Sequence, residues 1–192
     1  MVSMKKKSYT KLIISLAVPI FAFYCIVFLL SEASNSYKEP QEAILANDIA
    51  SDMDFLLIPV YKVNDQALFL FIKDKNNLGA VYADKGFFGW KAGMFTWSGY
   101  DKEIGSDKLE DIHGHGGNLI FGLIRDGDEH LVKVNGNNAK ILNLAMLSPG
   151  IVEEFQLEGL YIWYFESDTP LSDAEIKLVS KNTGEELHSV DF

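Results

Sequence analysis

The stretch FLLIPVYKVNDQALFLFIKDKNNLGAVYA, residues 55–83, decides the fold because three runs rich in β-branched and aromatic residues follow one another there. These runs cover residues 55–63, 67–73 and 78–83. Asn64-Asp65 and residues 74–77 separate them with the residue types that turns favour. Two strand-like runs joined by so short a turn predict a β-hairpin. The stretch therefore predicts three consecutive antiparallel strands.

Further strand-like runs fill the rest of the chain. They cover residues 94–98, 118–125, 129–134, 139–144, 155–165, 174–179 and 185–190. Asp126-Gly127-Asp128 predicts a hairpin between the second and third of these runs, and residues 181–184 predict another between the last two. The run 155–165 is apolar or aromatic at successive positions, which indicates a strand buried on both faces. Turn signals about every 8–12 residues are typical of a sandwich or a barrel.

A short helix is predicted ahead of the first strand. Pro40 suits the first turn of a helix, and Ile44, Leu45 and Ile49 follow at helical spacing. We therefore predict a helix over 40–53. Residues 40–192 together predict a mainly β domain with an antiparallel, sandwich- or barrel-like architecture. The glycine-rich stretch near residue 115 leaves open a division of this domain into two.

Residues 12–30 read LIISLAVPIFAFYCIVFLL and predict a transmembrane helix, because they carry no charge. At about 1.5 Å per residue this helix is roughly 28 Å long, close to the ~30 Å of a bilayer's hydrocarbon core. The basic residues before it are Lys5, Lys6, Lys7 and Lys11. The positive-inside tendency then places residues 1–11 in the cytoplasm as a basic tail. A linker over 31–39 joins the helix to a domain outside the membrane.

The apolar segment predicts either a retained signal anchor or a cleaved signal peptide. Ser31-Glu32-Ala33 has small residues where signal peptidase requires them, so cleavage near Ala33 would give a secreted domain. The segment is longer than the ~7–15 residues of a signal-peptide core, which favours the anchor. Cys25 lies inside the segment after the bulky Tyr24, which favours a thiol buried in the membrane over a lipidated one.

The charge of the chain excludes one class of partner. Four of the 17 basic and one of the 27 acidic side chains lie in residues 1–33, so the remaining 13 and 26 give residues 34–192 a net charge of −13. Such a surface repels phosphate backbones, and we predict no nucleic-acid partner. Because Cys25 is the only cysteine, the domain cannot use disulfides and depends on its packed core.

Residues 85–100, KGFFGWKAGMFTWSGY, combine six aromatic side chains with four glycines. Glycine permits tight turns, and aromatic rings supply a large contact area. An exposed stretch of this kind would bind a sugar chain, a peptide or the membrane interface beside the anchor. A buried one would close one end of a β core. The possible recognition loop is formed by Phe87, Phe88, Trp90 and Trp97.

The segment DIHGHGG, residues 111–117, is a cluster of potential metal ligands. Its two histidines can face one ion from an extended strand, and Asp111 could add an oxygen. A further ligand, such as His130 or His188, would have to arrive through the fold, and a flexible connecting loop is the alternative. The sequence contains no nucleophile elbow, P-loop or zinc-binding helix motif. It therefore predicts no catalytic residue, no cofactor and no metal site.

GFFGWK at residues 86–91 occurs together with VYKVN at 60–64, VNGNNAKI at 134–141 and IWYF at 162–165. In this combination the chain resembles a group of uncharacterised small exported or membrane-anchored proteins of Bacillus-like Gram-positive bacteria. The likeness covers most of residues 40–192. It implies a domain outside the cytoplasmic membrane, and it implies no activity and no catalytic residue.

These observations predict a single-pass, membrane-anchored extracytoplasmic protein. Its expected role is to bind or modulate a partner at the outer face of the membrane without catalysis. The expected partners are the membrane itself and a protein or cell-wall ligand. The alternative is a metal-dependent or hydrolytic enzyme that uses His113 and His115, and an immunity-type protein is a third possibility.

Overall fold

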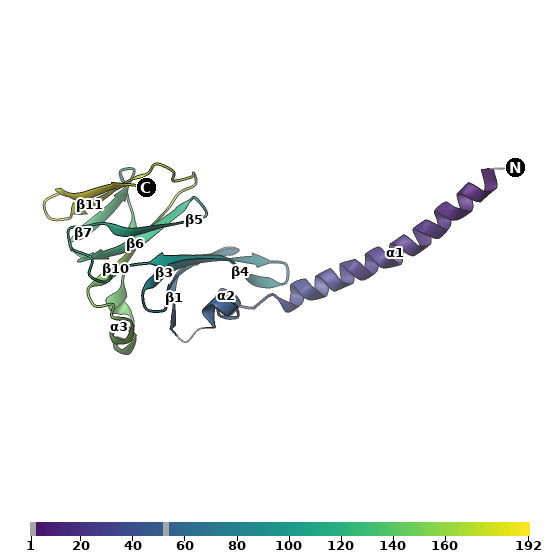
Figure 1. Ribbon diagram of the computed structural model, residues 1–192, viewed down its shortest axis with the longest axis horizontal. Coiled ribbons are helices and arrows are strands. Elements are labelled where there is room, and N and C mark those ends of the chain that lie inside the picture. Colours follow the sequence, from purple (N-terminus) through teal and green to yellow (C-terminus); the bar gives the residue numbers. More distant parts are fainter. Residues whose placement is uncertain (1–2, 52–53) are drawn as a thin grey trace.

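The computed structural model describes the backbone of residues 3–51 and 54–192, and the side chains of residues 15–51 and 54–192. The chain is mainly β, with 47% of its residues in strands and 22% in helices, and its strands form three antiparallel sheets of four strands each. The predicted fold class is therefore confirmed. Of the two predicted architectures, the sandwich is the one observed, because the sheets stack and none closes into a barrel within the described residues (Figure 1).

Sheet A is a meander whose strand order follows the chain. Its strands are β1 (Phe55–Val63), β2 (Gln66–Lys73), β3 (Asn77–Gly86) and β4 (Gly89–Gly99). The hairpins predicted for residues 55–83 are confirmed, since Val63 pairs with Gln66 and Lys73 pairs with Asn77. Asn64 and Asp74 adopt positive φ at these two turns, a conformation that Asn and Asp tolerate better than most residues.

Sheets B and C are interleaved along the chain. Sheet B contains, in spatial order, β5 (Glu110–His115), β6 (Leu119–Arg125), β10 (Leu160–Glu166) and β9 (Lys140–Asn143). Sheet C contains β12 (Glu186–Asp191), β11 (Glu175–Ser180), β7 (His130–Val134) and β8 (Asn137–Asn138). The chain passes between the two sheets after β6, after β8 and after β10, so neither sheet forms from one continuous segment.

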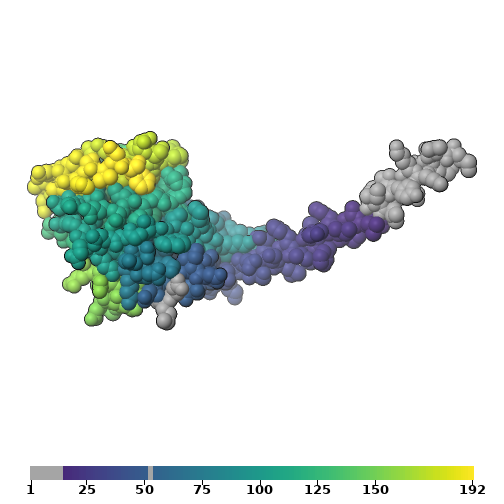
Figure 2. All heavy atoms as spheres, in the orientation of Figure 1, coloured from purple at the N-terminus to yellow at the C-terminus, as the bar shows by residue number. Residues whose placement is uncertain are grey.

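The helices lie at the ends and edges of this stack. They are α1 (Ser3–Ser34), α2 (Pro40–Leu45), the 3₁₀ helices η1 (Asp48–Ala50) and η2 (Leu144–Met146), and α3 (Pro149–Phe155). Helix α1 projects from the domain, as Figure 2 shows. Its window Ser15–Ser34 has a mean hydropathy of 2.1 and none of it is buried, so it is long and apolar enough to cross a membrane. The side chains of residues 12–14 of the predicted span, and of its lysine cluster, lie outside those described.

Helix α2 covers the outer face of sheet A. Ala43 and Ile44 of the helix pack in one cluster with Phe69, Phe71 and Trp90 of the sheet. The helix predicted over 40–53 ends earlier than expected, at Leu45. Asn47 redirects the chain there, because its side chain accepts a hydrogen bond of 3.0 Å from the backbone N–H of Ile49 and caps η1. The last two residues of the predicted helix lie outside the described ones.

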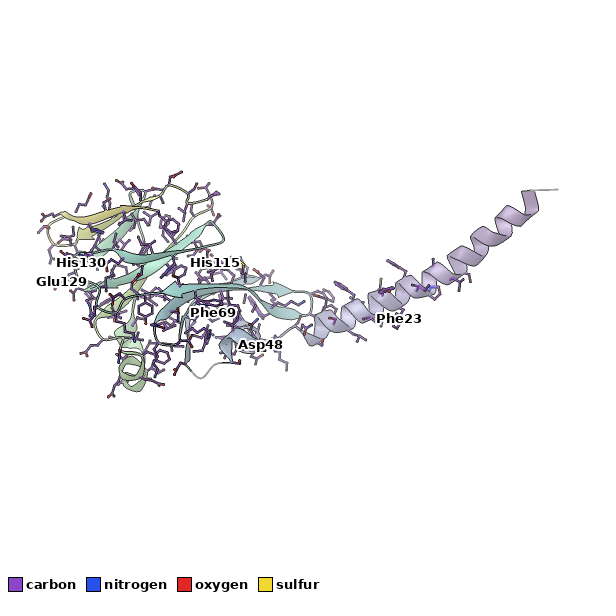
Figure 3. All side chains as sticks on the ribbon, viewed as in Figure 1. Phe23, Asp48, Phe69, His115, Glu129 and His130 are labelled. Atoms are coloured by element: carbon purple, nitrogen blue, oxygen red, sulfur yellow. The ribbon has the colours of Figure 1, made fainter. Side chains whose placement is uncertain are left out.

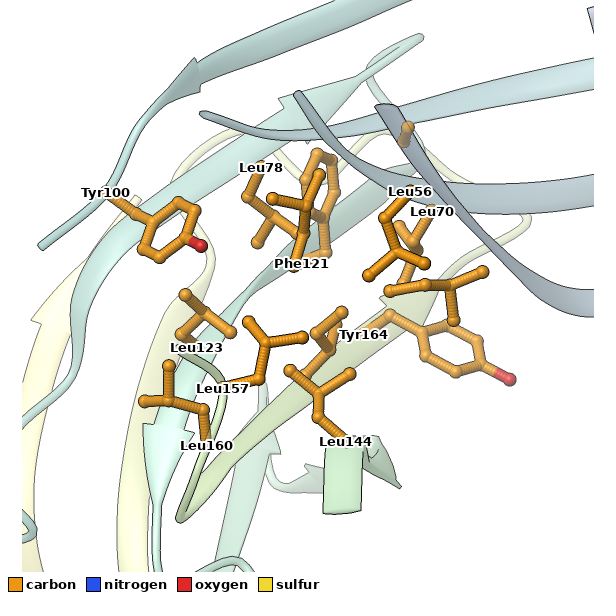
Figure 4. Close-up of a cluster of buried hydrophobic side chains, with 14 of the residues drawn as sticks. Leu56, Leu70, Leu78, Tyr100, Phe121, Leu123, Leu144, Leu157, Leu160 and Tyr164 are labelled. Atoms are coloured by element: carbon orange, nitrogen blue, oxygen red, sulfur yellow. The ribbon is translucent and has the colours of Figure 1, made fainter. Parts of the chain in front are cut away.

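Sheet B lies between sheets A and C and has an apolar core on each face. On one face Phe121 and Leu123 meet Leu70 and Leu78 of sheet A (Figure 4). The second core joins side chains of sheets B and C, among them Ile120, Ile124, Trp163, Val132, Ile176 and Leu178. The prediction of a strand buried on both faces is confirmed for residues 160–164. The first residues of that run do not join the strand, because Phe155 ends α3, Gln156 adopts the left-handed conformation and the chain turns before Leu160.

The hairpin predicted across Asp126-Gly127-Asp128 is wrong, because β6 and β7 belong to different sheets. Both edges of β6 are already paired, with β5 and with β10, so the chain must leave sheet B after Arg125. Sheet C takes up β7 beside β11 instead. The acidic turn is a connection between layers, and Lys181 Nζ donates a hydrogen bond of 2.7 Å to its Gly127 carbonyl.

Removing one side chain from the core between sheets A and B should destabilise the whole fold. Leu70 is fully buried there, and a Leu→Ala change in such a core typically costs about 2–5 kcal/mol. We expect that loss for Leu70→Ala in urea unfolding of the full chain in detergent, followed by tryptophan fluorescence. Leu45→Ala is the matched control, since Leu45 is 52% exposed, and should change the unfolding free energy by less than about 0.5 kcal/mol. Equal effects of the two variants would contradict the layer arrangement.

Candidate functional site

A polar cleft opens where one edge of sheet A faces sheet B. Its volume is about 630 Å³, within the range of about 300–1,000 Å³ that small-molecule sites occupy. It is lined by residues of β3, of the β5–β6 turn, of the β8–β9 segment and of the end of β10, together with Gln66 at the start of β2. A second hollow of about 730 Å³ adjoins it and shares Gln66, Lys140, Glu166 and Asp168. The two hollows therefore form one continuous polar groove.

Glu166 accepts hydrogen bonds from two tyrosine hydroxyls in this groove. Tyr82 donates a hydrogen bond of 2.6 Å from its hydroxyl to Oε1 of Glu166, and Tyr61 donates bonds of 2.9 Å and 3.0 Å to the two carboxylate oxygens. Burial, reinforced by the hydrogen bond and the charge of Glu166, raises the pKa of both tyrosine hydroxyls well above its ordinary value. Both therefore stay neutral donors, and they hold the carboxylate of sheet B against two strands of sheet A.

Negative charge predominates in the groove. Asp65, Asp84, Glu166 and Asp168 contribute carboxylates to its described lining, whereas Lys140 contributes a positive charge. The Lys140 ammonium lies 5.5 Å from the centre of the Tyr164 ring, in a cation–π contact. The groove thus offers carboxylates and aromatic surface together. Chemically, this combination suits a ligand that carries amino or guanidinium groups.

His115 forms part of the same wall. Its ring is buried, lies 5.3 Å from the Tyr82 ring, and places Nδ1 2.7 Å from the hydroxyl of Thr96 (Figure 3). Burial lowers its pKa, so the imidazole stays neutral. The connecting loop considered for residues 111–117 is confined to its last two residues. Residues 110–115 are strand β5, and the glycines that follow, Gly116 and Gly117, supply the positive φ values of its turn.

His113 lies on the same strand but away from the groove. Its ring packs 5.4 Å from the Phe121 ring, and its Nε2 is buried without a hydrogen-bond partner. Burial lowers the pKa of His113, against an opposing effect of the Asp111 charge. His130 and His188 do not join the pair, because they contact the Arg125 carbonyl and the Leu109 amide. Within the residues that the structure describes, no group of three potential metal ligands forms.

The aromatic-glycine stretch forms the β3–β4 hairpin, and its predicted recognition residues are separated by the fold. Phe87, at the hairpin tip, is 96% exposed, and Phe88 beside it is 41% exposed. Trp97 is 44% exposed and rests against Phe71. Trp90 is 2% exposed and belongs to the core under α2, so its assignment to a recognition surface is corrected.

Sequence reasoning missed the groove itself. Tyr61, Tyr82, Lys140 and Glu166 come from four separate segments, and no two of them are close in the chain. The fold brings them together because sheets A and B meet at this edge. Isolated polar residues within predicted strands were the sole local signal, and such residues more often face solvent.

A scan against known protein families found no match to this chain, and searches of curated proteins and of solved structures found none either.

The burial of Trp90 can be tested by truncation. Trp90→Ala should lower the free energy of unfolding by about 3–5 kcal/mol, because it empties the largest position of the core under α2. Phe87→Ala, three residues away, should keep the free energy of unfolding within about 0.5 kcal/mol of the wild type, since the exposed Phe87 side chain makes few contacts that truncation could remove. Urea unfolding of the full chain in detergent measures both. If Trp90→Ala left the free energy of unfolding unchanged, the burial of Trp90 in this core would be contradicted.

Burial of His113 predicts a pH dependence of stability. Because its pKa is lowered in the folded protein, the unfolded chain takes up a proton first as the pH falls through about 6.5. Stability should therefore decrease from about pH 7.5 to about pH 5.5, and the decrease should be smaller in His113→Phe. Chemical unfolding at the two pH values measures this difference. The same decrease in both proteins would show that His113 does not contribute.

Proposed function

We propose that this protein is a single-pass membrane protein whose β domain lies outside the cytoplasm and binds a positively charged segment of a partner. The apolar helix α1 supports the anchor. The lysines before it, in a chain whose remainder is strongly acidic, support an outward-facing domain. The resemblance to exported proteins of Gram-positive bacteria supports the same location.

The observation that carries the binding role is the Glu166 carboxylate fixed in the groove by two neutral tyrosine hydroxyls. A carboxylate held in place before binding loses little conformational freedom when a cation arrives. Asp84 and Asp168 line the same groove and add negative charge. A basic stretch of a protein, or an amine-bearing cell-wall polymer, has the positive charge that these carboxylates would bind. Because the groove extends over two adjoining hollows, it can hold a chain rather than a single ion.

The enzyme alternative has weaker support. His115 and Glu166 do line the same groove, which is the observation in its favour. However, Nδ1 of His115 is engaged by Thr96, and His113 faces the interior beside Phe121. Of the two histidines, His115 thus lines the groove and His113 does not. The side chains that carry the binding role, by contrast, already lie together there.

Binding can be tested with pentalysine, and pentaglutamate serves as the probe of opposite charge. Pentalysine should bind the full chain in detergent, and Glu166→Gln/Asp168→Asn should raise its Kd at least about tenfold, because loss of charge-assisted contacts costs about 1.5–3 kcal/mol. Isothermal titration calorimetry measures both peptides.

The control removes the same charge elsewhere. Glu154→Gln/Glu158→Gln changes two exposed carboxylates in and after α3, outside the groove, and should leave the Kd within about twofold. Near-ultraviolet circular dichroism confirms that both double variants are folded. If both double variants raised the Kd of pentalysine equally, binding would depend on overall charge, and the proposed binding role of the groove would be contradicted.

A further inference from the structure

The tip of the β3–β4 hairpin presents two phenylalanines to the surroundings of the domain. Phe87 and Phe88 are exposed, and their rings meet edge to face with centroids 5.1 Å apart. Gly86 and Gly89 flank them and close the hairpin. Exposed aromatic pairs at a loop tip are unfavourable in water and are a feature of sites that meet an apolar partner.

The fold holds this tip beside the end of α1. Tyr37, in the short segment after α1, forms a two-way backbone bridge with Trp90: its N–H donates to the Trp90 carbonyl over 2.9 Å, and the Trp90 N–H donates back over 2.8 Å. Gly89 permits this approach, since a Cβ there would lie 2.4 Å from the Tyr37 carbonyl oxygen. Lys91 forms an ion pair with Glu32 in the last turns of α1. Figure 1 shows the hairpin reaching from the domain to this end of the helix.

Four lysines lie around the tip, although the domain as a whole is acidic. Lys85 precedes the phenylalanines on β3, Lys91 follows them on β4, and Lys38 adjoins the bridged Tyr37. Lys62 lies over the Trp90 ring, 5.2 Å from its centre, and forms an ion pair of 2.6 Å with Glu39, whereas Lys85 and Lys38 leave their charge for lipid headgroups. Aromatic side chains and lysines together are typical of segments that lie in the headgroup region of a bilayer, where the rings are buried and the ammonium groups attract anionic lipids.

We propose that Phe87 and Phe88 insert into the outer lipid surface next to the point where α1 leaves the membrane. The contact rests on the proposed membrane span of α1, because that span brings the tip to the bilayer. The bilayer is the occupant that the position of the tip favours, since the Tyr37–Trp90 bridge ties the hairpin within a few residues of the apolar segment. The domain is then attached at two points, by the helix and by the hairpin.

A fluorescent label at the tip tests this contact in the full chain. Cys25→Ala removes the native thiol, and Phe87→Cys carries an environment-sensitive dye in vesicles of phosphatidylcholine and phosphatidylglycerol. We expect its emission to shift to shorter wavelength and to be quenched by brominated acyl chains. The control label at Asn182→Cys lies on the exposed β11–β12 turn, at the far end of the domain (Figure 1), and should show neither effect.

The outcomes separate the two proposals. Failure of the unlabelled chain to float with vesicles would overturn the membrane span and, with it, the hairpin contact. Flotation without quenching at residue 87 would overturn the hairpin contact alone. A label at residue 87 that is unquenched in vesicles but shielded from aqueous quenchers in native membranes would assign the tip to a protein and overturn the lipid contact. A second variant, Phe87→Ser/Phe88→Ser, should remain folded and float with vesicles. When the dye is attached at Lys85→Cys, brominated acyl chains should quench it less in this variant than in the protein that keeps both phenylalanines.

Discussion

Sheet B has neither face in water, and the rest of the fold covers it. Its two central strands, β6 and β10, are apolar on both sides, so each side needs another sheet. Gly122 lies where β6 passes beneath Trp163, because a Cβ at this position would approach the indole Nε1 to 2.9 Å. The paired cores explain how a domain without cysteine reaches stability by packing alone. Helix α2 completes the series by covering the outer face of sheet A.

The groove is a consequence of the same stacking. Sheets A and B share an apolar core in the middle of their contact, and polar side chains replace it at one edge. There the hydroxyls of Tyr61 and Tyr82 meet Glu166, so the contact between the sheets continues as hydrogen bonds. The groups that fasten the two layers are thus the groups that a ligand would encounter, which links occupancy of the groove to the stability of the sheet contact.

Local chemistry in the sequence predicted most strands and the turns of sheet A, because Asn64-Asp65 and residues 74–77 act on their immediate neighbours. It failed where the outcome depended on distant pairing. Asp126-Gly127-Asp128 has the composition of a hairpin turn, but composition does not reveal that both edges of β6 are taken. The glycines around His115 resembled a loop, although that residue ends a strand paired with β6. The exposure of Trp90 was undecided for the same reason, since Tyr37 and α2 cover it from elsewhere in the chain.

The order of the strands along the chain has a consequence for biosynthesis. Sheet A is complete at Gly99, and its pairs form between neighbours, so it can assemble while the rest of the chain is still being made. Its inner face stays uncovered until β6 and β10 are available, and β10 ends only at Glu166. A nascent or truncated chain therefore displays a finished sheet with an open apolar side. Apolar surface of this kind is prone to aggregation, and the risk lasts from the completion of sheet A until the later strands cover it.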